Sequence, residues 1–167
     1  LVVISILFCL QGVAPFGGKS LLTIDFFHQY GPMLGELFDR IKSRSSLLYS
    51  FNMSMGLPFY RNFFNYLSSP FNVLMILFNH KELLTSFSVI VLVKLCFSTF
   101  FMYMFLKKKV GLSNVLTVCL SLLYSFSAYF VAYYWNIMWL DGMVFLPLIV
   151  YGLERMLIQR KPLVYVL

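Results

Sequence analysis

Acidic residues are scarce in this chain, which has only six Asp and Glu against thirteen Lys and Arg in 167 residues. Charged residues of both signs make up 11% of the sequence, and apolar residues make up 60%. A soluble domain normally devotes about a quarter of its residues to charge. This shortage excludes an ordinary soluble domain. Together with a mean hydropathy of +0.84, it predicts an all-α membrane protein with several spans.

Cysteine is also rare, and its placement excludes two further classes of protein. Cys9, Cys96 and Cys119 lie in apolar segments without paired spacing, which argues against a disulfide framework or a zinc site. The chain also lacks a P-loop, the GxSxG, HExxH and CxxC motifs, and a dinucleotide-binding fingerprint. The corresponding classes of enzyme are therefore not indicated.

The basic residues do not form a nucleic-acid surface, although the net charge is +7. They gather where apolar segments end, as "LKKKV" at 106–110 and "RMLIQRK" at 155–161. Cytoplasmic loops of membrane proteins carry such clusters. We therefore expect membrane lipids, and no nucleic acid, around the chain.

Four apolar segments predict membrane spans, at residues 1–14, 83–106, 114–134 and 142–158. The second is the clearest, because as a helix it would be about 36 Å long, enough to cross a bilayer with some tilt. The chain begins inside an apolar run and ends at "KPLVYVL", which resembles the start of another span. We expect residues 1–167 to be the N-terminal part of a single transmembrane domain, cut at both ends.

The positive-inside rule orients these spans. If Lys107–Lys109 and the cluster at 155–161 are cytoplasmic, the loops at 15–81 and 133–141 face outside. The long outer loop is not a plain linker, since "GPMLGELFDRIKS" (31–43) and "LPFYRNFFNYLS" (57–68) have apolar residues at helical spacing. They predict amphipathic helices at the outer interface, and "SSPFNVLMILFN" predicts another, capped by Ser69.

A polar group interrupts the apolar sequence at "LLTIDFFHQYGP" (21–32). Asp25 lies about ten residues beyond the first predicted span, and His28, Gln29 and Tyr30 begin three residues after Asp25. A carboxylate at the membrane surface can act as general base on an acceptor hydroxyl or hold a divalent metal. The alternative is a structural aspartate that caps a helix or forms a salt bridge. A helix would bring His28 to the same face, to bind a phosphate or simply to bond water.

Lys94 lies near the centre of the span at 83–106. An ionisable side chain at that depth costs about 2.5–3.5 kcal/mol to insert, so a partner or a function is expected. Two interpretations remain open, an ion pair with another span and a cation facing a cavity that receives a lipid-linked phosphate.

Asp141 ends the second outer loop, and opposing spans would bring it near Asp25 for acid–base work or a shared metal. The alternative is an interfacial charge beside a belt of aromatic residues. Those aromatics are Tyr133, Tyr134, Trp135 and Trp139. Arg61 and Asn52, the latter within "YSFNMSMG", are further polar candidates in the long outer loop.

Four stretches of the sequence resemble the YfhO family of bacterial membrane proteins, in the same order and over nearly the whole chain. They are "PFGGKSLLTIDFFHQYGP", "LLYSFNMSMG", "YLSSPFNVLMILF" and "YYWNIMWLDGMVFLPLIVYGLERML". The resemblance implies a GT-C type glycosyltransferase. Such an enzyme moves a sugar from a polyprenyl-phosphate carrier to a cell-wall polymer, such as lipoteichoic acid, on the outer face.

The resemblance also implies roles for individual residues. Asp25 matches the acidic residue of the first outer loop, and Asp141 would be a second acid. Paired acids, which many GT-C enzymes have at the first position, are missing from "TIDFF", which leaves a divalent metal as an option only. Lys94, Arg61 or His28 would steady the departing lipid phosphate.

Two other functions remain open at this point. A transporter or lipid flippase would use Lys94 as a substrate-binding or proton-relay residue, and would have broken spans in matched halves. A non-catalytic scaffold for cell-envelope assembly would tolerate the loss of both Asp25 and Asp141.

Overall fold

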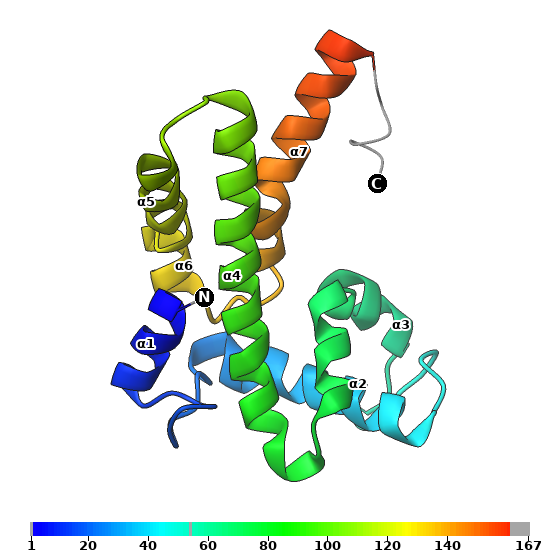
Figure 1. Ribbon diagram of the computed structural model, residues 1–167. Helices are drawn as coiled ribbons and strands as arrows, with labels where there is room; N and C mark the ends of the chain where they lie inside the picture. Colours follow the sequence, from blue (N-terminus) through cyan, green and yellow to red (C-terminus); the bar gives the residue numbers. More distant parts are fainter. Residues whose placement is uncertain (1, 54, 161–167) are drawn as a thin grey trace. The chain divides into compact units, whose positions relative to one another are not determined.

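The computed structural model describes residues 2–53 and 55–160 (Figure 1). These residues form seven α-helices and four shorter helical turns, and they contain two isolated β-bridges but no strand. The all-α prediction is confirmed for this part of the chain. The span expected to start at "KPLVYVL" lies outside the described residues.

The chain divides into two compact units. Unit 1 contains the residues up to Val93 together with Trp135–Met138, and unit 2 contains Lys94–Tyr134 together with the residues from Trp139 onward. The long helix α4 (Leu83–Lys109) contributes to both.

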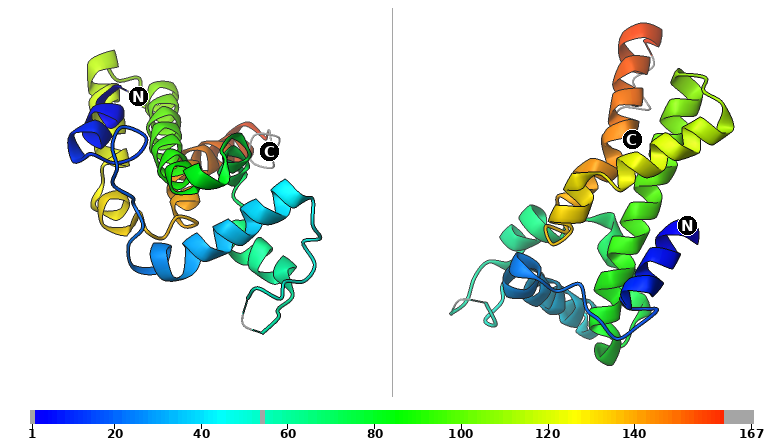
Figure 2. Two further views of the ribbon diagram at one scale, coloured as in Figure 1. Left: turned by 90° about the horizontal axis from the view of Figure 1, so that it is seen from below. Right: turned by 90° about the vertical axis from the view of Figure 1, so that its left-hand side faces the viewer.

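Unit 1 is made of short helical elements around an aromatic-rich core. Along the chain these are α1 (Val2–Gln11), η1 (Phe26–Tyr30), α2 (Gly31–Ser43), α3 (Phe59–Asn62), η2 (Phe63–Leu67), η3 (Pro70–Leu77), η4 (His80–Glu82) and the start of α4. The course from α2 to α3 can be followed in Figure 2. The helix predicted from "GPMLGELFDRIKS" is confirmed as α2, which buries Leu34, Leu37 and Phe38 on one face.

The other two interfacial segments are helical, but not with the expected geometry. The segment after Pro58 changes from α-helix to a π-helical turn at Phe63, which shifts its faces relative to a 3.6-residue period. Phe59 is fully buried, whereas Phe64, expected on the apolar face, is 70% exposed. The segment after Ser69 is a 3₁₀ helix, and the Ser69 side chain makes no capping hydrogen bond, contrary to the prediction.

Unit 2 contains α4 from Lys94 onward, α5 (Asn114–Ser125), α6 (Ala128–Tyr133) and α7 (Leu140–Gln159). The segment at 114–134 is therefore helical, with a break between α5 and α6, and the one at 142–158 lies within α7. Two segments of the described chain are long and apolar enough to cross a membrane, His80–Lys109 and Asn114–Tyr133. Helix α1 is apolar but shorter.

Helix α5 buries hydroxyl groups and exposes hydrocarbon, the reverse of a helix at the surface of a soluble protein. Thr117, Ser121 and Ser125 recur every fourth residue and are fully buried, while Val115 and Leu123 are 75% and 68% exposed. Hydroxyl-bearing residues are enriched where membrane helices pack together. The pattern of α5 is that of a helix whose outer face contacts lipid.

Side-chain contacts fix the directions of the unit 2 helices (Figure 1). Thr99 on α4 bonds Ser125 at the end of α5 (2.8 Å), and Lys107 bonds Asn114 at its start (2.6 Å), so α4 and α5 are antiparallel. Helices α4 and α7 run in the same direction, because α4 forms one ion pair near the start of α7 and a second near its end.

A proline inside α7 is accommodated by a neighbouring helix. Pro147 has no N–H, so the carbonyl of Met143, four residues earlier, loses its normal helical donor. The hydroxyl of Tyr124 on α5 donates a hydrogen bond of 2.7 Å to this carbonyl. Side chains of neighbouring helices commonly satisfy backbone groups that proline frees inside a membrane.

Because the Tyr124 hydroxyl replaces the N–H that Pro147 lacks, the stability effects of substituting Tyr124 and Pro147 should be coupled. Tyr124→Phe leaves the Met143 carbonyl without a donor, and it should destabilise the protein by about 1–3 kcal/mol. In a Pro147→Ala background the helix supplies its own N–H, so the same substitution should cost much less. Thermal unfolding in detergent of the wild type, both single variants and the double variant measures this coupling. Equal costs of Tyr124→Phe in both backgrounds would contradict the assignment.

Candidate functional site

The segment that carries Asp25 begins with a tight loop at the end of α1. The Ala14 N–H donates to the Lys19 carbonyl and the Lys19 N–H to the Gly12 carbonyl, both at 3.0 Å. A Cβ atom on Gly17 would lie 2.4 Å from the Gly12 carbonyl oxygen, so only glycine fits there. This geometry accounts for Gly17 of the "PFGGKS" sequence and turns the chain from α1 toward Asp25.

The backbone is strained directly before Asp25. Ile24 has φ +48°, in the left-handed region where a β-branched residue is rare. Such a conformation costs about 1–3 kcal/mol and is concentrated at functional sites. Asp25 itself is half-buried and precedes the π-helical turn η1, where its side chain makes no capping hydrogen bond.

All six carboxylates of the chain lie in the described residues, and five of them are engaged. Glu36 bonds Arg40, Asp39 lies 3.3 Å from His80, and Glu82 caps its own short helix. Asp141 and Glu154 pair with lysines of α4. Asp25 is the exception, since no hydrogen bond or ion pair joins it to any other described residue. Neither structural alternative for this residue, a helix cap or a salt bridge, is present.

The turn η1 directs the residues after Asp25 to opposite sides. Phe26 and Tyr30 are buried, whereas Phe27 and His28 are exposed. The Gly31 N–H donates back to the Phe26 carbonyl, which closes the wide turn and starts α2. A Cβ atom on Gly31 would lie 2.6 Å from that carbonyl oxygen, so the turn needs glycine at this position.

Three of the predicted site residues gather in one cleft of unit 1. His28 and Gln29 from η1 face Asn52 from the loop between α2 and α3. The cleft has a volume of about 240 Å³ and is completed by Pro32, Met33, Glu36 and Met53. An imidazole, two amides and a carboxylate offer donors and acceptors of the kind that sugar hydroxyls and phosphates bind.

Glu36, which the sequence analysis did not single out, holds this cleft together. One carboxylate oxygen accepts hydrogen bonds from Arg40 Nε and Ser50 Oγ, both at 2.7 Å, and the other accepts from Asn52 Nδ2 at 2.9 Å. Burial raises the pKa of Glu36, but the bonds from Asn52, Ser50 and Arg40 outweigh it, and the pKa lies below its ordinary value. Arg40 follows Glu36 by four residues, a spacing that places both side chains on one face of a helix. This spacing could have revealed the pair from the sequence.

Three other predicted residues of unit 1, Asp25, Tyr30 and Arg61, are not among those that line the cleft. The Tyr30 hydroxyl donates to Asn136 Oδ1 at 3.2 Å, so this buried residue anchors Trp135–Met138 within unit 1. Burial, followed by the Asp25 charge, raises the pKa of Tyr30 above its ordinary value. Arg61 is exposed on α3 and is not among the residues that line the cleft.

In unit 2 the structure identifies a partner for Lys94. Its Nζ lies 2.8 Å from Asp141 Oδ1, the Lys94 side chain is fully buried, and the Asp141 side chain is 20% exposed. The ion-pair interpretation of Lys94 is therefore correct. Asp141 is in the first turn of α7, where a carboxylate also interacts favourably with the helix dipole.

The residues around Asp25 do not fit a metal site. Within residues 2–53 and 55–160, no three His, Cys, Asp or Glu side chains come together in an arrangement that could hold an ion.

The whole chain, residues 1–167, matches the family described as bacterial membrane protein YfhO. The chain belongs to this family. The resemblance seen in the four sequence stretches is confirmed, and so is the membrane location, which the apolar helices α4 and α5 support independently. No curated protein and no solved structure matches the chain.

The Glu36 network makes the YfhO-family cleft sensitive to acid. Since the folded-state pKa of Glu36 is lowered, its carboxylate adds stability above the ordinary value of 4.5, and this stability is lost as the pH falls from there through the folded-state value. Cleavage of the loop at 44–58 by pepsin, expressed relative to cleavage of an unfolded peptide at the same pH because pepsin itself is more active in acid, should therefore rise over this acid range. Glu36→Gln should be cleaved readily at every pH tested. The same acid-dependent step in Glu36→Gln would show that another group is responsible.

The Lys94–Asp141 pair should be strongly coupled. Lys94→Met or Asp141→Asn alone leaves one group in a largely buried place without its partner, which typically costs about 3–5 kcal/mol. The double variant should recover a large part of that loss. Thermal unfolding in detergent measures the three variants, and Lys109→Gln serves as control because its pair with Glu154 is partly exposed. Additive losses in the double variant would argue against the coupling.

Proposed function

We propose that this YfhO-family chain is part of a GT-C type glycosyltransferase that moves a sugar from a polyprenyl-phosphate carrier to a cell-wall polymer. The observation that carries the proposal is Asp25, the one carboxylate of six that forms no hydrogen bond or ion pair with any described residue. A general base must be free to accept a proton, and the other five carboxylates are committed to partners.

In the proposed reaction Asp25 accepts the proton of an acceptor hydroxyl. The hydroxyl oxygen bonds to the anomeric carbon of the donor sugar while the bond from that carbon to the phosphate oxygen breaks. The products are the glycosylated acceptor, with inverted configuration, and the polyprenyl phosphate. Negative charge develops on the departing phosphate, so a nearby donor stabilises the transition state.

Among the residues proposed to steady that phosphate, His28 has the most suitable surroundings. It is exposed and lines the cleft with Gln29 and Asn52, two amides that can bind sugar hydroxyls. Lys94 is already engaged by Asp141, so these two act in the proposal by fixing α4 to α7. Arg61, exposed on α3, is left to contact a polymeric acceptor.

The proposal places the site on the extracytoplasmic face of a multi-pass protein. Helix α4 has 27 residues and is about 40 Å long, whereas a bilayer core is about 30 Å thick. Lys94 lies opposite the first turn of α7, which follows the loop expected outside. The portion from Lys94 to Lys109 is about 22 Å long. Lys94 then lies toward the outer boundary of the membrane, and the proposal takes the loop at 15–81, which carries Asp25, to face outside.

A transporter or lipid flippase is the second candidate, because the structure contains a broken span. The helical segment from Asn114 to Tyr133 is interrupted between Ser125 and Ala128. Discontinuous helices and buried ionisable residues are both typical of transporters. The ion pair of Lys94 with Asp141 would then take part in proton or substrate movement.

Replacement of Asp25 separates the two candidates. Asp25→Asn should lower sugar transfer from a polyprenyl-phosphate donor at least about 100-fold in membrane vesicles, because the general base is lost. Insertion into the membrane should be unchanged. Asp39→Asn is the matched control, since Asp39 is an exposed carboxylate of the same loop whose pair with His80 is worth little.

Two outcomes distinguish the transferase from the transporter. Normal glycosylation by Asp25→Asn would refute the transferase proposal. Translocation of a lipid or solute by the wild type, with sugar transfer absent from it, would support the transporter instead.

A further inference from the structure

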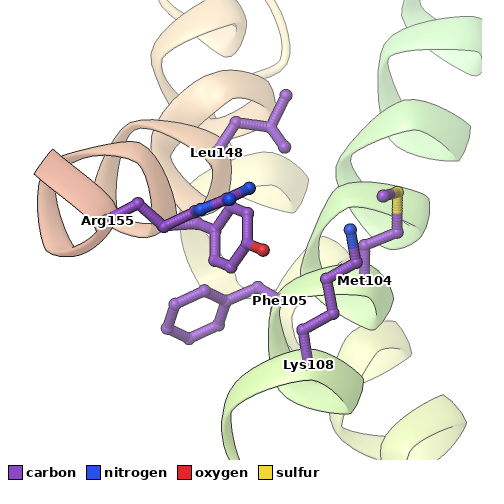
Figure 3. Close-up of a pocket in the computed structure, with 6 residues that line it drawn as sticks. Met104, Phe105, Lys108, Leu148 and Arg155 are labelled. Carbon is purple, nitrogen blue, oxygen red and sulfur yellow. The ribbon is translucent and has the colours of Figure 1, made fainter. Parts of the chain in front are cut away.

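A second pocket lies within unit 2, between the C-terminal halves of α4 and α7 (Figure 3). It has a volume of about 200 Å³ and plays no part in the proposed transfer reaction. Its walls are Met104, Phe105 and Lys108 from α4, with Leu148, Tyr151 and Arg155 from α7. Figure 3 shows Lys108 and Arg155 reaching toward the pocket from the two helices.

Positive charge is concentrated around this pocket. The Nζ atoms of Lys108 and Lys109 each lie 5.3 Å from the centroid of the Tyr151 ring, and Arg155 Cζ lies 5.7 Å from it. Glu154 neutralises Lys109 through an ion pair of 2.5 Å. Lys108 forms no salt bridge with any other residue in the described part of the chain. Lys108 therefore brings a positive charge to the pocket that no carboxylate of the described residues neutralises, which suits an anion.

The pocket also lies at a boundary between apolar and basic residues. Met104, Phe105 and Leu148 line it with hydrocarbon, while the basic run Lys107–Lys109 ends α4 directly beyond them. A free phosphate would use only the cations. A phospholipid, in contrast, carries an anionic phosphate directly next to its hydrocarbon chains, and so matches both parts of the lining.

We propose that this pocket binds an anionic phospholipid of the membrane leaflet on the Lys107–Lys109 side. The lipid phosphate lies between Lys108 and Arg155, and the beginning of the acyl chains packs against Met104, Phe105 and Leu148. Basic pockets between transmembrane helices bind anionic headgroups in this way. The bound lipid adds a contact between α4 and α7 near the Lys109–Glu154 pair.

Native mass spectrometry of the protein, purified in detergent and supplied with phosphatidylglycerol or phosphatidylcholine, tests the proposal. The wild type should retain phosphatidylglycerol in preference to phosphatidylcholine. Lys108→Gln with Arg155→Gln should lower its retention at least about fivefold for each charge removed. Arg160→Gln, which removes an exposed cation beyond the pocket on the same side, should leave retention unchanged.

Leu148→Trp provides a second test that leaves every charge in place. It fills the apolar part of the pocket, so it should lower retention of phosphatidylglycerol even though electrostatic attraction to the surface is unchanged. If the double charge variant is unstable, Lys108→Gln alone, which changes an exposed side chain, takes its place in the first test.

Three results would overturn the proposal. One is equal retention of the two lipids by the wild type, and another is undiminished retention by both the charge variants and Leu148→Trp. The third is complete displacement of the lipid by excess inorganic phosphate, which would identify a simple anion site. Variants are compared only if they elute as a single species and keep their helical circular dichroism.

Discussion

The constraint on which unit 2 depends is that polar groups surrounded by hydrocarbon must find partners within the protein. The buried ammonium of Lys94 has a carboxylate at 2.8 Å, and the carbonyl freed by Pro147 has the hydroxyl of Tyr124. The hydroxyls of α5 bond the preceding turn or Ser98 and Thr99 of α4. Because each of these bonds fixes a helix against its neighbour or completes a helix internally, they determine which faces of α4, α5 and α7 meet. Hydrocarbon side chains then point outward, as Leu123 on α5 does.

Unit 1 handles its polar groups differently, and the difference concerns carboxylates. Glu36 is enclosed by three donors that keep it ionised and hold Asn52 in the cleft, so its charge is used for structure. Asp25 lies behind a strained residue and has no such donors among the residues described. The chain has only six acidic residues, so a carboxylate without a structural role is unusual. This contrast, rather than the position of Asp25 in the sequence alone, distinguishes the proposed base from the structural acids.

The sequence predicted long, strongly periodic elements well and local geometry poorly. Helix α2 and the length of α4 followed from apolar spacing and from proline, while the π-helical turns at Phe26–Tyr30 and Phe63–Leu67 did not. Those turns depend on close contacts such as that between Gly31 and the Phe26 carbonyl, which no period reveals. The cleft that joins His28, Gln29 and Asn52 was anticipated only as a set of polar residues, because a loop brings Asn52 back to η1. The partner of Lys94 was not predicted, since Asp141 lies far away in the sequence.

The bonds around α7 also bear on the choice between a transferase and a transporter. Helix α7 is tied to α4 near both ends, by Lys94–Asp141 and Lys109–Glu154, and to α5 through the Tyr124 hydroxyl. Alternating access requires part of a bundle to move against the rest. These bonds oppose any movement of α7 against α4 and α5. The proposed proton transfer to Asp25 would require no such movement, because Asp25, the cleft and the Glu36 network that supports the cleft all belong to unit 1. On these grounds the transferase is the simpler account of the arrangement.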